Sequence, residues 1–460
     1  MIIKFCGAAG GEVTGSKHLI KTDKGNILFD CGLFQGRRAE SVQKNLNFLF
    51  TPDEVDAVVI SHAHIDHIGV LPVLVKNGYK KDIYLTDVTD ELSRIMLLDS
   101  ARLQVEDAKF FNKIHQKDGL VIEPLYDEDD ATKAFGFFKK VKRYESFYPV
   151  ESVEVKFFNA GHVLGSSTVS IKIDGTKILY TGDIGRRNQL ILKRPEFDKD
   201  VDYLIIETTY GDREHTDVSG VKEVFADIIN KAVKNKGKII IPSFSLERTQ
   251  EIIYLLDSLR HEKDVFPIPV YVDSPMSVRV TNIFNKHIEE VDFNNDFTTY
   301  SRDDKDPFGY EYIKYISNKE ESQALNDMSG PMIIISASGM CEGGRILHHL
   351  RNSIDDDRNI VLLVGYMAEN TLGRRLKDGA KKVKIFGLEH EVYSEVRSMD
   401  FFSAHAGQSD LIEYVKEINP KKGILLVHGE NKSRAGFKKV LMDNGFKNIF
   451  MPDYGEEVEI

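Results

Sequence analysis

Residues 61–69 bring together side chains that are typical metal ligands. The segment reads Ser-His-Ala-His-Ile-Asp-His-Ile-Gly and places His62, His64, Asp66 and His67 within six residues. Imidazole and carboxylate groups suit zinc, and their alternation along a turn can direct ligands at two ions at once. Surface histidines without a ligand role are a poor alternative, because four candidate ligands lie so close together. The segment therefore predicts a metal site.

Other polar residues follow apolar runs that predict buried strands. Each run ends abruptly at a polar or charged residue, and strand ends are where sheet proteins place their chemistry. We therefore expect functional residues at the ends of these strands. The runs are residues 27–29 before Asp30, 57–60 before Ser61, 177–180 before the Thr-Gly-Asp sequence that ends at Asp183, and 424–427 before His428.

The middle of the chain has a different pattern, in which strands and helices alternate. Between about residues 213 and 385, this alternation predicts a parallel sheet with crossover helices, and hence a separate α/β domain. The earlier pattern, an apolar run that ends at a candidate ligand, returns at residues 402–428. We therefore expect the first domain to be interrupted by the second and completed after it. Residues 88–140 are expected to be a helical elaboration of the first domain. The predicted strands are 238–242, 268–272, 332–335 and 359–364, with helices at about 247–259 and 276–287.

Length and composition favour a two-domain protein of the cytoplasm. A chain of 460 residues is too long for one compact core, and its hydrophobic content is an ordinary 42%. No run of about 20 apolar residues could cross a bilayer, so no membrane partner is expected. Residues 1–5 have a strand-like pattern and lack the layout of a signal peptide.

Cysteine spacing and charge constrain the site further. Cys6, Cys31 and Cys341 show no Cys-x-x-Cys spacing, so we interpret them as buried hydrophobic residues and not as zinc ligands. The net charge of −11 disfavours broad electrostatic binding to a nucleic-acid duplex. Basic pairs such as residues 186–187 and 374–375 still allow a narrow basic cleft around a metal centre.

The pattern His-x-His-x-Asp-His resembles the signature of hydrolases with the metallo-β-lactamase fold. The resemblance implies an αββα sandwich and extends to Asp30, His162 and Asp183, which match other motif positions of that family. It implies that one zinc binds His62, His64 and His162, that the other binds Asp66 and His67, and that Asp183 bridges both. Asp30 is expected to orient the histidine loop from behind.

Three further motifs resemble the β-CASP group of this superfamily, whose members process nucleic acids. Glu207 in Ile-Glu-Thr-Thr-Tyr-Gly resembles motif A, His405 in Ser-Ala-His-Ala-Gly resembles motif B, and His428 in Val-His-Gly-Glu resembles motif C. His428 would complete the ligands of the second zinc. Histidine at motif C is typical of RNA-processing members, so RNA is favoured over DNA. The layout is most similar to compact bacterial and archaeal relatives of the cleavage and polyadenylation endonuclease subunit.

This resemblance implies an architecture and a mechanism. The fold class is α/β: a metallo-β-lactamase sandwich (1–212 and 386–460) interrupted by an α/β β-CASP domain with a mainly parallel sheet (213–385). Two zinc ions would activate a hydroxide that attacks the RNA phosphodiester, leaving 5′-phosphate and 3′-hydroxyl ends. His405 would protonate the leaving oxygen or stabilise the phosphorane charge, and Glu207 would fix the tautomer of His405.

Candidate RNA contacts lie in the interrupting domain. Residues 336–345 follow a strand and precede a helical run, so backbone N–H groups there could bind a phosphate, with Ser338, Gly339 and Arg345 as the candidates. Ser245 and Arg248 have the same strand-to-helix placement, and Arg374 belongs to the same class of candidate. Turn formation, helix capping and salt bridges explain these residues equally well.

Several alternatives remain open at this stage. They are a small-molecule hydrolase of the same fold, a DNA nuclease, and a non-catalytic RNA-binding scaffold. The single-stranded RNA substrate is compatible with internal cleavage, which we favour, and with 5′–3′ exonuclease activity. Manganese is an alternative to zinc, because oxygen and nitrogen ligands accept both metals. A homodimer is an assembly that the resemblance allows.

Overall fold

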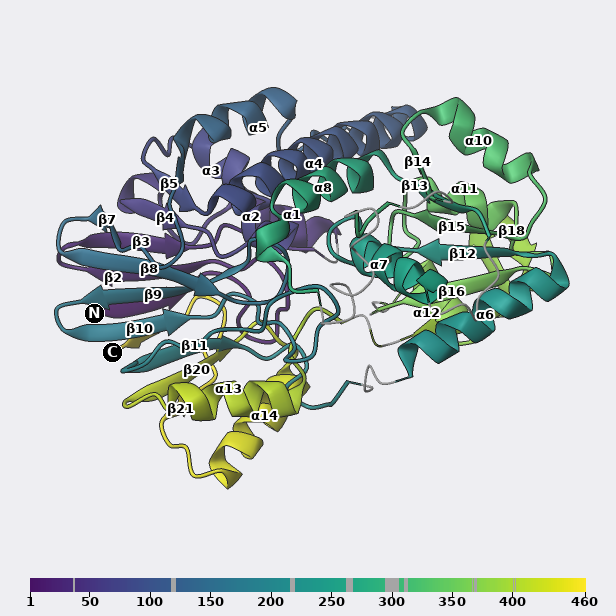
Figure 1. Ribbon diagram of the computed structural model, residues 1–460. Coiled ribbons are helices and arrows are strands. Elements are labelled where there is room, and N and C mark those ends of the chain that lie inside the picture. Colours follow the sequence, from purple (N-terminus) through teal and green to yellow (C-terminus); the bar gives the residue numbers. More distant parts are fainter. Residues whose placement is uncertain are drawn as a thin grey trace. The chain divides into compact units, whose positions relative to one another are not determined.

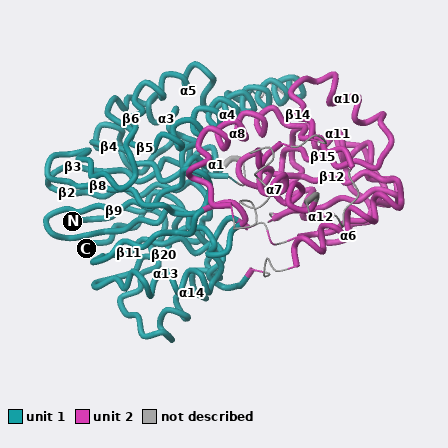
Figure 2. Tube along the Cα trace, in the orientation of Figure 1, with its two compact units in different colours: residues 1–189, 193–214, 404–460 teal, residues 190–192, 215–403 magenta. Residues whose placement is uncertain are grey.

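The chain folds into two units, and three separate segments build the first of them (Figure 2). Unit 1 consists of Met1–Gln189, Lys193–Glu214 and Ala404–Ile460, and unit 2 of Leu190–Leu192 and His215–Ser403. This computed structural model describes residues 1–35, 38–116, 121–215, 220–261, 268–293, 306–309, 313–365, 367, 370–399, 401 and 403–460.

Two sheets form the centre of unit 1 (Figure 1). In the described residues, the first sheet has the order β22 (Glu457–Glu459), β1 (Ile2–Phe5), β2 (His18–Thr22), β3 (Gly25–Phe29), β4 (Ala57–Val59), β5 (Ile83–Leu85) and β6 (Phe138–Lys140). The second has the order β21 (Ile449–Phe450), β20 (Gly423–Val427), β11 (Tyr203–Glu207), β10 (Thr176–Tyr180), β9 (Ser167–Ile173), β8 (Val153–Asn159) and β7 (Phe147–Val150).

The core of unit 1 lies between these sheets. Apolar side chains of both sheets are buried in one cluster, and the ring of Phe29 on β3 stacks on Tyr180 of β10 with 5.1 Å between ring centroids. Strand β8 illustrates how the sequence directs side chains into this core. Alternate residues from Val153 to Asn159 are buried. Such a period of two is typical of a strand with one face on the core.

Helices cover the outer faces of unit 1, with α3, α4 and α5 on one side and α13 and α14 on the other (Figure 1). A second apolar cluster joins the outer face of β11 and β20 to α13 and α14. This arrangement confirms the predicted αββα sandwich. The helices are α1 (Arg38–Leu46), α2 (Ile65–Ile68), α3 (Leu71–Lys76), α4 (Asp87–Ile114), α5 (Glu128–Ala134), α13 (Gln408–Ile418) and α14 (Asn431–Asp443).

Unit 2 is an α/β unit whose main sheet is parallel in every described strand pair, which confirms the predicted mainly parallel sheet. Its order is β14 (Ile313–Ile316), β13 (Val270–Asp273), β15 (Met332–Ser336), β12 (Lys238–Pro242), β16 (Ile360–Val364) and β19 (Glu395–Met399), and β17 (Lys382–Ile385) pairs with β18 (Leu388–Glu391). The helices described here are α6 (Val221–Asn235), α7 (Arg248–His261), α8 (Pro275–Lys286), α10 (Lys319–Asp327), α11 (Ile346–Arg351) and α12 (Leu372–Lys377).

The end of unit 2 differs from the boundary proposed at residue 385. The unit continues to Ser403, because β19 is an edge strand that pairs in parallel with β16. In addition, Leu192 forms a bridge with Val291, which explains why Leu190–Leu192 group with unit 2.

A buried carboxylate at the end of β13 organises one face of unit 2. Asp273 is fully buried, and its Oδ2 accepts hydrogen bonds from Ser322 Oγ and His349 Nε2, each at 2.6 Å. Its Oδ1 accepts from Arg345 Nη1, also at 2.6 Å. The carboxylate thereby joins α10, α11 and the loop that carries Arg345.

We expect Asp273→Ala to destabilise the protein by about 3–5 kcal/mol, because it leaves the buried partners of this carboxylate unpaired. Chemical denaturation monitored by circular dichroism measures this change. The matched control is Asp378→Ala, which removes an exposed partner of Arg374 and should cost less than about 1 kcal/mol. Equal unfolding midpoints for the two variants would contradict the assignment.

Candidate metal centre

The candidate site of unit 1 lies where several strands end at the same edge of the two sheets. Strands β8, β10, β11 and β20 run in the same direction, because β9 is antiparallel to both β8 and β10 and the others pair in parallel. Their carboxyl ends therefore meet at one edge, where His162, Asp183, Glu207 and His428 lie. In the first sheet, β3 and β4 also run in parallel and end before Asp30 and Ser61.

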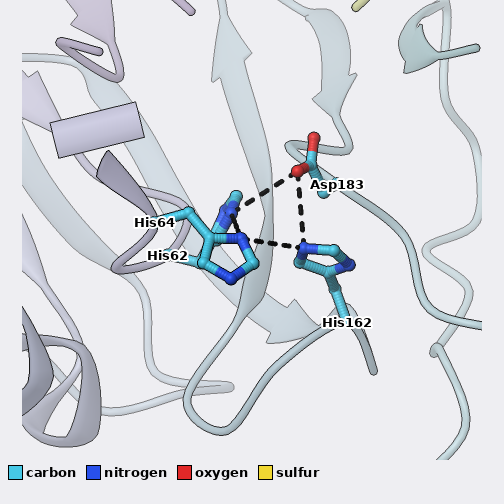
Figure 3. A group of neighbouring side chains, drawn as sticks. All are labelled: His62, His64, His162 and Asp183. Atoms are coloured by element: carbon cyan, nitrogen blue, oxygen red, sulfur yellow. Dashed lines mark hydrogen bonds and ion pairs between the residues drawn. The ribbon is translucent and has the colours of Figure 1, made fainter. Parts of the chain in front are cut away.

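The first donor cluster consists of His62, His64, His162 and Asp183 (Figure 3). Nδ1 of His64 lies 3.1 Å from Nε2 of His62 and 3.1 Å from Nε2 of His162. Oδ2 of Asp183 lies 3.5 Å from Nε2 of His62 and 3.4 Å from Nε2 of His162. Four donor atoms from distant parts of the chain thus surround one point.

The second donor cluster consists of Asp66, His67 and His428, together with the other oxygen of Asp183. Nε2 of His67 lies 3.3 Å from Nε2 of His428 and 3.3 Å from Oδ1 of Asp183. Nε2 of His428 lies 3.5 Å from Oδ2 of Asp66 and 3.6 Å from Oδ1 of Asp183. Asp183 therefore presents one carboxylate oxygen to each cluster.

These distances fit a divalent metal ion in each cluster. Four ligands at about 2.0–2.1 Å from a tetrahedral zinc are separated from one another by about 3.3 Å, which agrees with the spacings above. Burial is the largest of the causes that hold the pKa of His62 and of His162 well below the ordinary value, and burial lowers the pKa of His64 to about 4. Neutral imidazoles whose bare nitrogens converge on one point need a cation among them.

Asp30 lies behind the histidine loop and accepts several hydrogen bonds from it. Its Oδ2 accepts hydrogen bonds from the hydroxyl groups of Ser61 and Tyr180 and from Nδ1 of His67, each at 2.7 Å. Because Nδ1 of His67 donates to Asp30, Nε2 keeps its lone pair for a ligand role. The Ser61 hydroxyl lies 3.0 Å from Nδ1 of His62 and accepts from it, so Nε2 of His62 is also a bare nitrogen.

His428 and the turn at Asp66 are held by similar means. Thr209 Oγ1 donates to the carbonyl oxygen of His428 at 3.2 Å and lies 3.1 Å from its Nδ1, which leaves Nε2 for the second cluster. The carbonyl oxygen of Asp66 accepts from the amide of Ser16 at 2.8 Å. Gly32 packs so closely on this turn that a Cβ there would lie 1.6 Å from that oxygen. The backbone therefore allows little movement of the ligand turn.

Glu207 and His405 form a third group beside Asp183. Nδ1 of His405 lies 3.0 Å from Oε1 and 3.1 Å from Oε2 of Glu207, and Oε1 also accepts from the amide of Ile184 at 2.7 Å. Burial alone would lower the pKa of His405, but the charges of Glu207 and Asp183 outweigh it and raise that pKa to about 9. The carboxylate of Glu207 at Nδ1 therefore favours the protonated form of the His405 ring.

The candidate RNA contacts all lie in unit 2: Ser245, Ser338, Gly339 and Arg345 in the loops after β12 and β15, Arg248 at the start of α7, and Arg374 within α12. Ser245 Oγ lies 3.2 Å from Ser274 Oγ, and the amide of Glu342 donates to Ser338 Oγ at 3.2 Å. A Cβ at Gly339 would lie 2.7 Å from the ring of Phe244, so the loops after β12 and β15 are in contact.

The arginine candidates have protein partners. Arg345 binds Asp273, Arg248 pairs with Glu251 on α7, and Arg374 binds both carboxylate oxygens of Asp378 at 2.9 Å. These contacts match the structural roles left open above, and an RNA role for these residues stays a prediction.

Some residues that position the site were not predicted. Tyr180, Ser16 and Thr209 hold ligand side chains or ligand backbone, and Ser61 orients two histidines. The signals were weak: Ser61 directly precedes His62, and Thr209 follows Glu207 by two residues. Tyr180 reads as an ordinary buried strand residue, and its contact with Asp30 spans 150 residues of the sequence.

Family models match almost the whole chain. A model described as the metallo-beta-lactamase superfamily matches residues 10–243, and one described as the Beta-Casp domain matches residues 249–376. A third, described as a Zn-dependent metallo-hydrolase RNA specificity domain, matches residues 389–452. In the part of the chain that the structure describes, no helix is long and apolar enough to cross a membrane.

Two curated relatives are similar to this chain over nearly their full length. The chain is 34% identical to a ribonuclease of Thermus thermophilus, with 98% of both chains covered. It is 32% identical to an RNase J-like protein of Methanocaldococcus jannaschii, with 99% of this chain and 97% of the relative covered. A solved structure, a protein of unknown function from Enterococcus faecalis, has the same fold with a TM-score of 0.57 at 13% identity, over 99% of each chain.

We expect Asp30→Asn to weaken the binding of divalent metal about 10- to 100-fold, because the amide cannot accept all the hydrogen bonds that orient His67 and the loop. Competition with a chromogenic chelator measures the affinity. Asp23→Asn is a matched control, since Asp23 is exposed in the turn between β2 and β3. Unchanged affinity in the Asp30 variant would show that ligand orientation does not depend on this carboxylate.

Proposed function

We propose that this chain, which belongs to the β-CASP family of the metallo-β-lactamase superfamily, is a metal-dependent ribonuclease acting on single-stranded RNA. The observation that carries the proposal is the bridging position of Asp183 between two four-donor clusters, with His405 beside it. A pair of divalent ions about 3.5–4 Å apart is typical of enzymes that cleave phosphodiesters. The relatives named as ribonucleases support RNA as the substrate class.

The donor set favours zinc, with manganese as the alternative. His62, His64 and His162 with Asp183 would hold one ion, and Asp66, His67 and His428 with Asp183 the other. Bound zinc lowers the pKa of water to near neutrality and stabilises negative charge on phosphate oxygens. The protein's own contribution is a rigid, largely buried set of ligands whose ring nitrogens are already bare.

His405 is the proposed acid of the reaction. A carboxylate facing Nδ1 favours the doubly protonated ring, as Glu207 does here, and Nε2 then donates its proton to the departing oxygen. The attacking group is water and not the ribose 2′-hydroxyl. The bond between phosphorus and the 3′-oxygen breaks, so the products carry a 5′-phosphate and a 3′-hydroxyl.

We expect the zinc-loaded protein, with two ions per chain, to cleave end-labelled single-stranded RNA and to leave 5′-phosphates. Asp66→Ala and His64→Ala should abolish cleavage, because each removes a ligand. Metal content by mass spectrometry and product ends by phosphatase sensitivity are the measurements. Internal fragments would indicate endonuclease activity, and mononucleotides would indicate exonuclease activity from the 5′ end.

Three other outcomes of that assay would reject the proposal in favour of a different function. Cleavage of the matching DNA but not of RNA would indicate a DNA nuclease. Intact RNA with two bound ions, and hydrolysis of thioesters or lactones, would indicate a small-molecule hydrolase. Tight RNA binding without any hydrolysis would indicate a scaffold.

We expect His405→Ala to lower kcat on RNA by about 10²- to 10⁴-fold, the usual contribution of a general acid. The same variant should lose little activity on a p-nitrophenyl phosphodiester, because p-nitrophenolate leaves without being protonated. Steady-state kinetics on both substrates test this. Equal losses on the two substrates would instead assign His405 to stabilising charge on the phosphate.

A further inference from the structure

An aromatic ring that the proposed reaction does not use lies beside His405. Tyr210 comes three residues after Glu207, and its half-buried ring has a centroid 6.1 Å from that of His405, at an interplanar angle of 59°. Its backbone pairs with Gly407, two residues beyond His405. Tyr210 therefore shares a short stretch of structure with the proposed acid.

One guanidinium group lies over this ring, and a second cation lies close to it. The guanidinium carbon of Arg213 lies 5.5 Å from the Tyr210 ring centre, and the Arg213 side chain is 49% exposed. Nε of Arg213 donates to Asp212 at 3.0 Å. Lys432, in the first turn of α14, lies 3.5 Å from the other oxygen of Asp212 and is 86% exposed. Two exposed cations thus flank one largely buried carboxylate next to the ring.

The turn that carries Tyr210 and Arg213 is held firmly on both sides. The amide and side chain of Gln408 on α13 donate to the carbonyl oxygens of Arg213 at 3.0 Å and Gly211 at 2.7 Å. On the other side, a Cβ at Gly211 would lie 2.7 Å from Cβ of Phe437 on α14. A ligand that uses this surface would meet a preorganised ring and guanidinium, which lowers the entropy cost of binding.

We propose that Tyr210 and Arg213 form a stacking site for the base of the nucleotide immediately 5′ of the cleaved bond. The inference rests on the proposed ribonuclease function, in which His405 protonates the 3′-oxygen of that same nucleotide. Aromatic rings and guanidinium planes bind unpaired RNA bases by stacking, and adjacent cations offset the phosphate charge. Because every base has a π face, such a site selects an unpaired base and not a particular sequence.

The test combines variants of the protein with variants of the RNA. In an RNA whose cut is mapped, each nucleotide near the cut is replaced in turn by an abasic ribose. We expect the intact protein to lose about 10-fold in kcat/KM when the nucleotide 5′ of the cut is abasic. Tyr210→Leu should show a similar loss on intact RNA and no further loss on that abasic RNA, whereas Tyr210→Phe should behave like the intact protein.

This design separates stacking from a structural role. If Tyr210 only supports His405, Tyr210→Leu will slow the intact and the abasic RNA equally, and the abasic penalty will persist, which would overturn the proposal. Tyr148→Leu is the matched control, because Tyr148 is an exposed tyrosine on β7. It should keep both the activity and the abasic penalty of the intact protein.

A binding measurement distinguishes this proposal from the ribonuclease assignment. The Asp66→Ala variant is saturated with RNA that carries 2-aminopurine at the position 5′ of the cut. Stacking on Tyr210 and Arg213 should quench the fluorescence, and adding Tyr210→Leu should restore it. If the intact protein cleaves no RNA, 2-aminopurine is placed at each position of the strand in turn, and Tyr210-dependent quenching at one position would retain the base site and reject the ribonuclease. Cleavage without Tyr210-dependent quenching would do the reverse.

Discussion

The carboxylate of Asp183 is shared by both donor clusters while being only 1% exposed. A buried carboxylate costs several kcal/mol unless positive charge accompanies it. Its neighbours are mainly imidazole nitrogens, and the other carboxylate of the second cluster, Asp66, adds further negative charge. Against the effect of burial, these carboxylates raise the pKa of His67 and of His428, so positive charge is favoured at the second cluster, and metal ions would supply it in both clusters. This electrostatic requirement explains why much of the surrounding polar structure serves to present bare ring nitrogens.

Asp30 orients one of these ligands and also connects the two sheets of unit 1. It follows β3 in the first sheet, yet it accepts a hydrogen bond from Tyr180 at the end of β10 in the second. The same oxygen orients His67, so the packing of the two sheets and the tautomer of a ligand depend on one carboxylate. Asp30 and His428 also adopt left-handed φ values of 56° and 48°. Such backbone conformations persist where surrounding contacts hold them, which is common at functional sites.

Local patterns in the sequence accounted for the strands, the ligand-rich turn and the alternation of unit 2, because each depends on neighbouring residues. Motif resemblance added His162, Asp183, Glu207, His405 and His428, which no local pattern joins to the histidine turn. The end of unit 2 was harder to predict from the sequence. The boundary expected at residue 385 leaves out residues 395–399, and their pairing with β16 groups them with unit 2.

By itself, the sequence determined which side chains can act as ligands and which family's motifs they match, because residue identity sets donor chemistry and spacing sets local geometry. The tertiary structure alone decided which nitrogen of each histidine is bare, that Asp183 divides its oxygens between two clusters, and that Tyr210 lies beside His405. Those features depend on contacts between segments more than 100 residues apart, such as Asp30 with Tyr180 and Tyr210 with His405. Contacts between residues so far apart in the sequence form only when the two sheets pack together. The sequence of one segment alone therefore does not predict them.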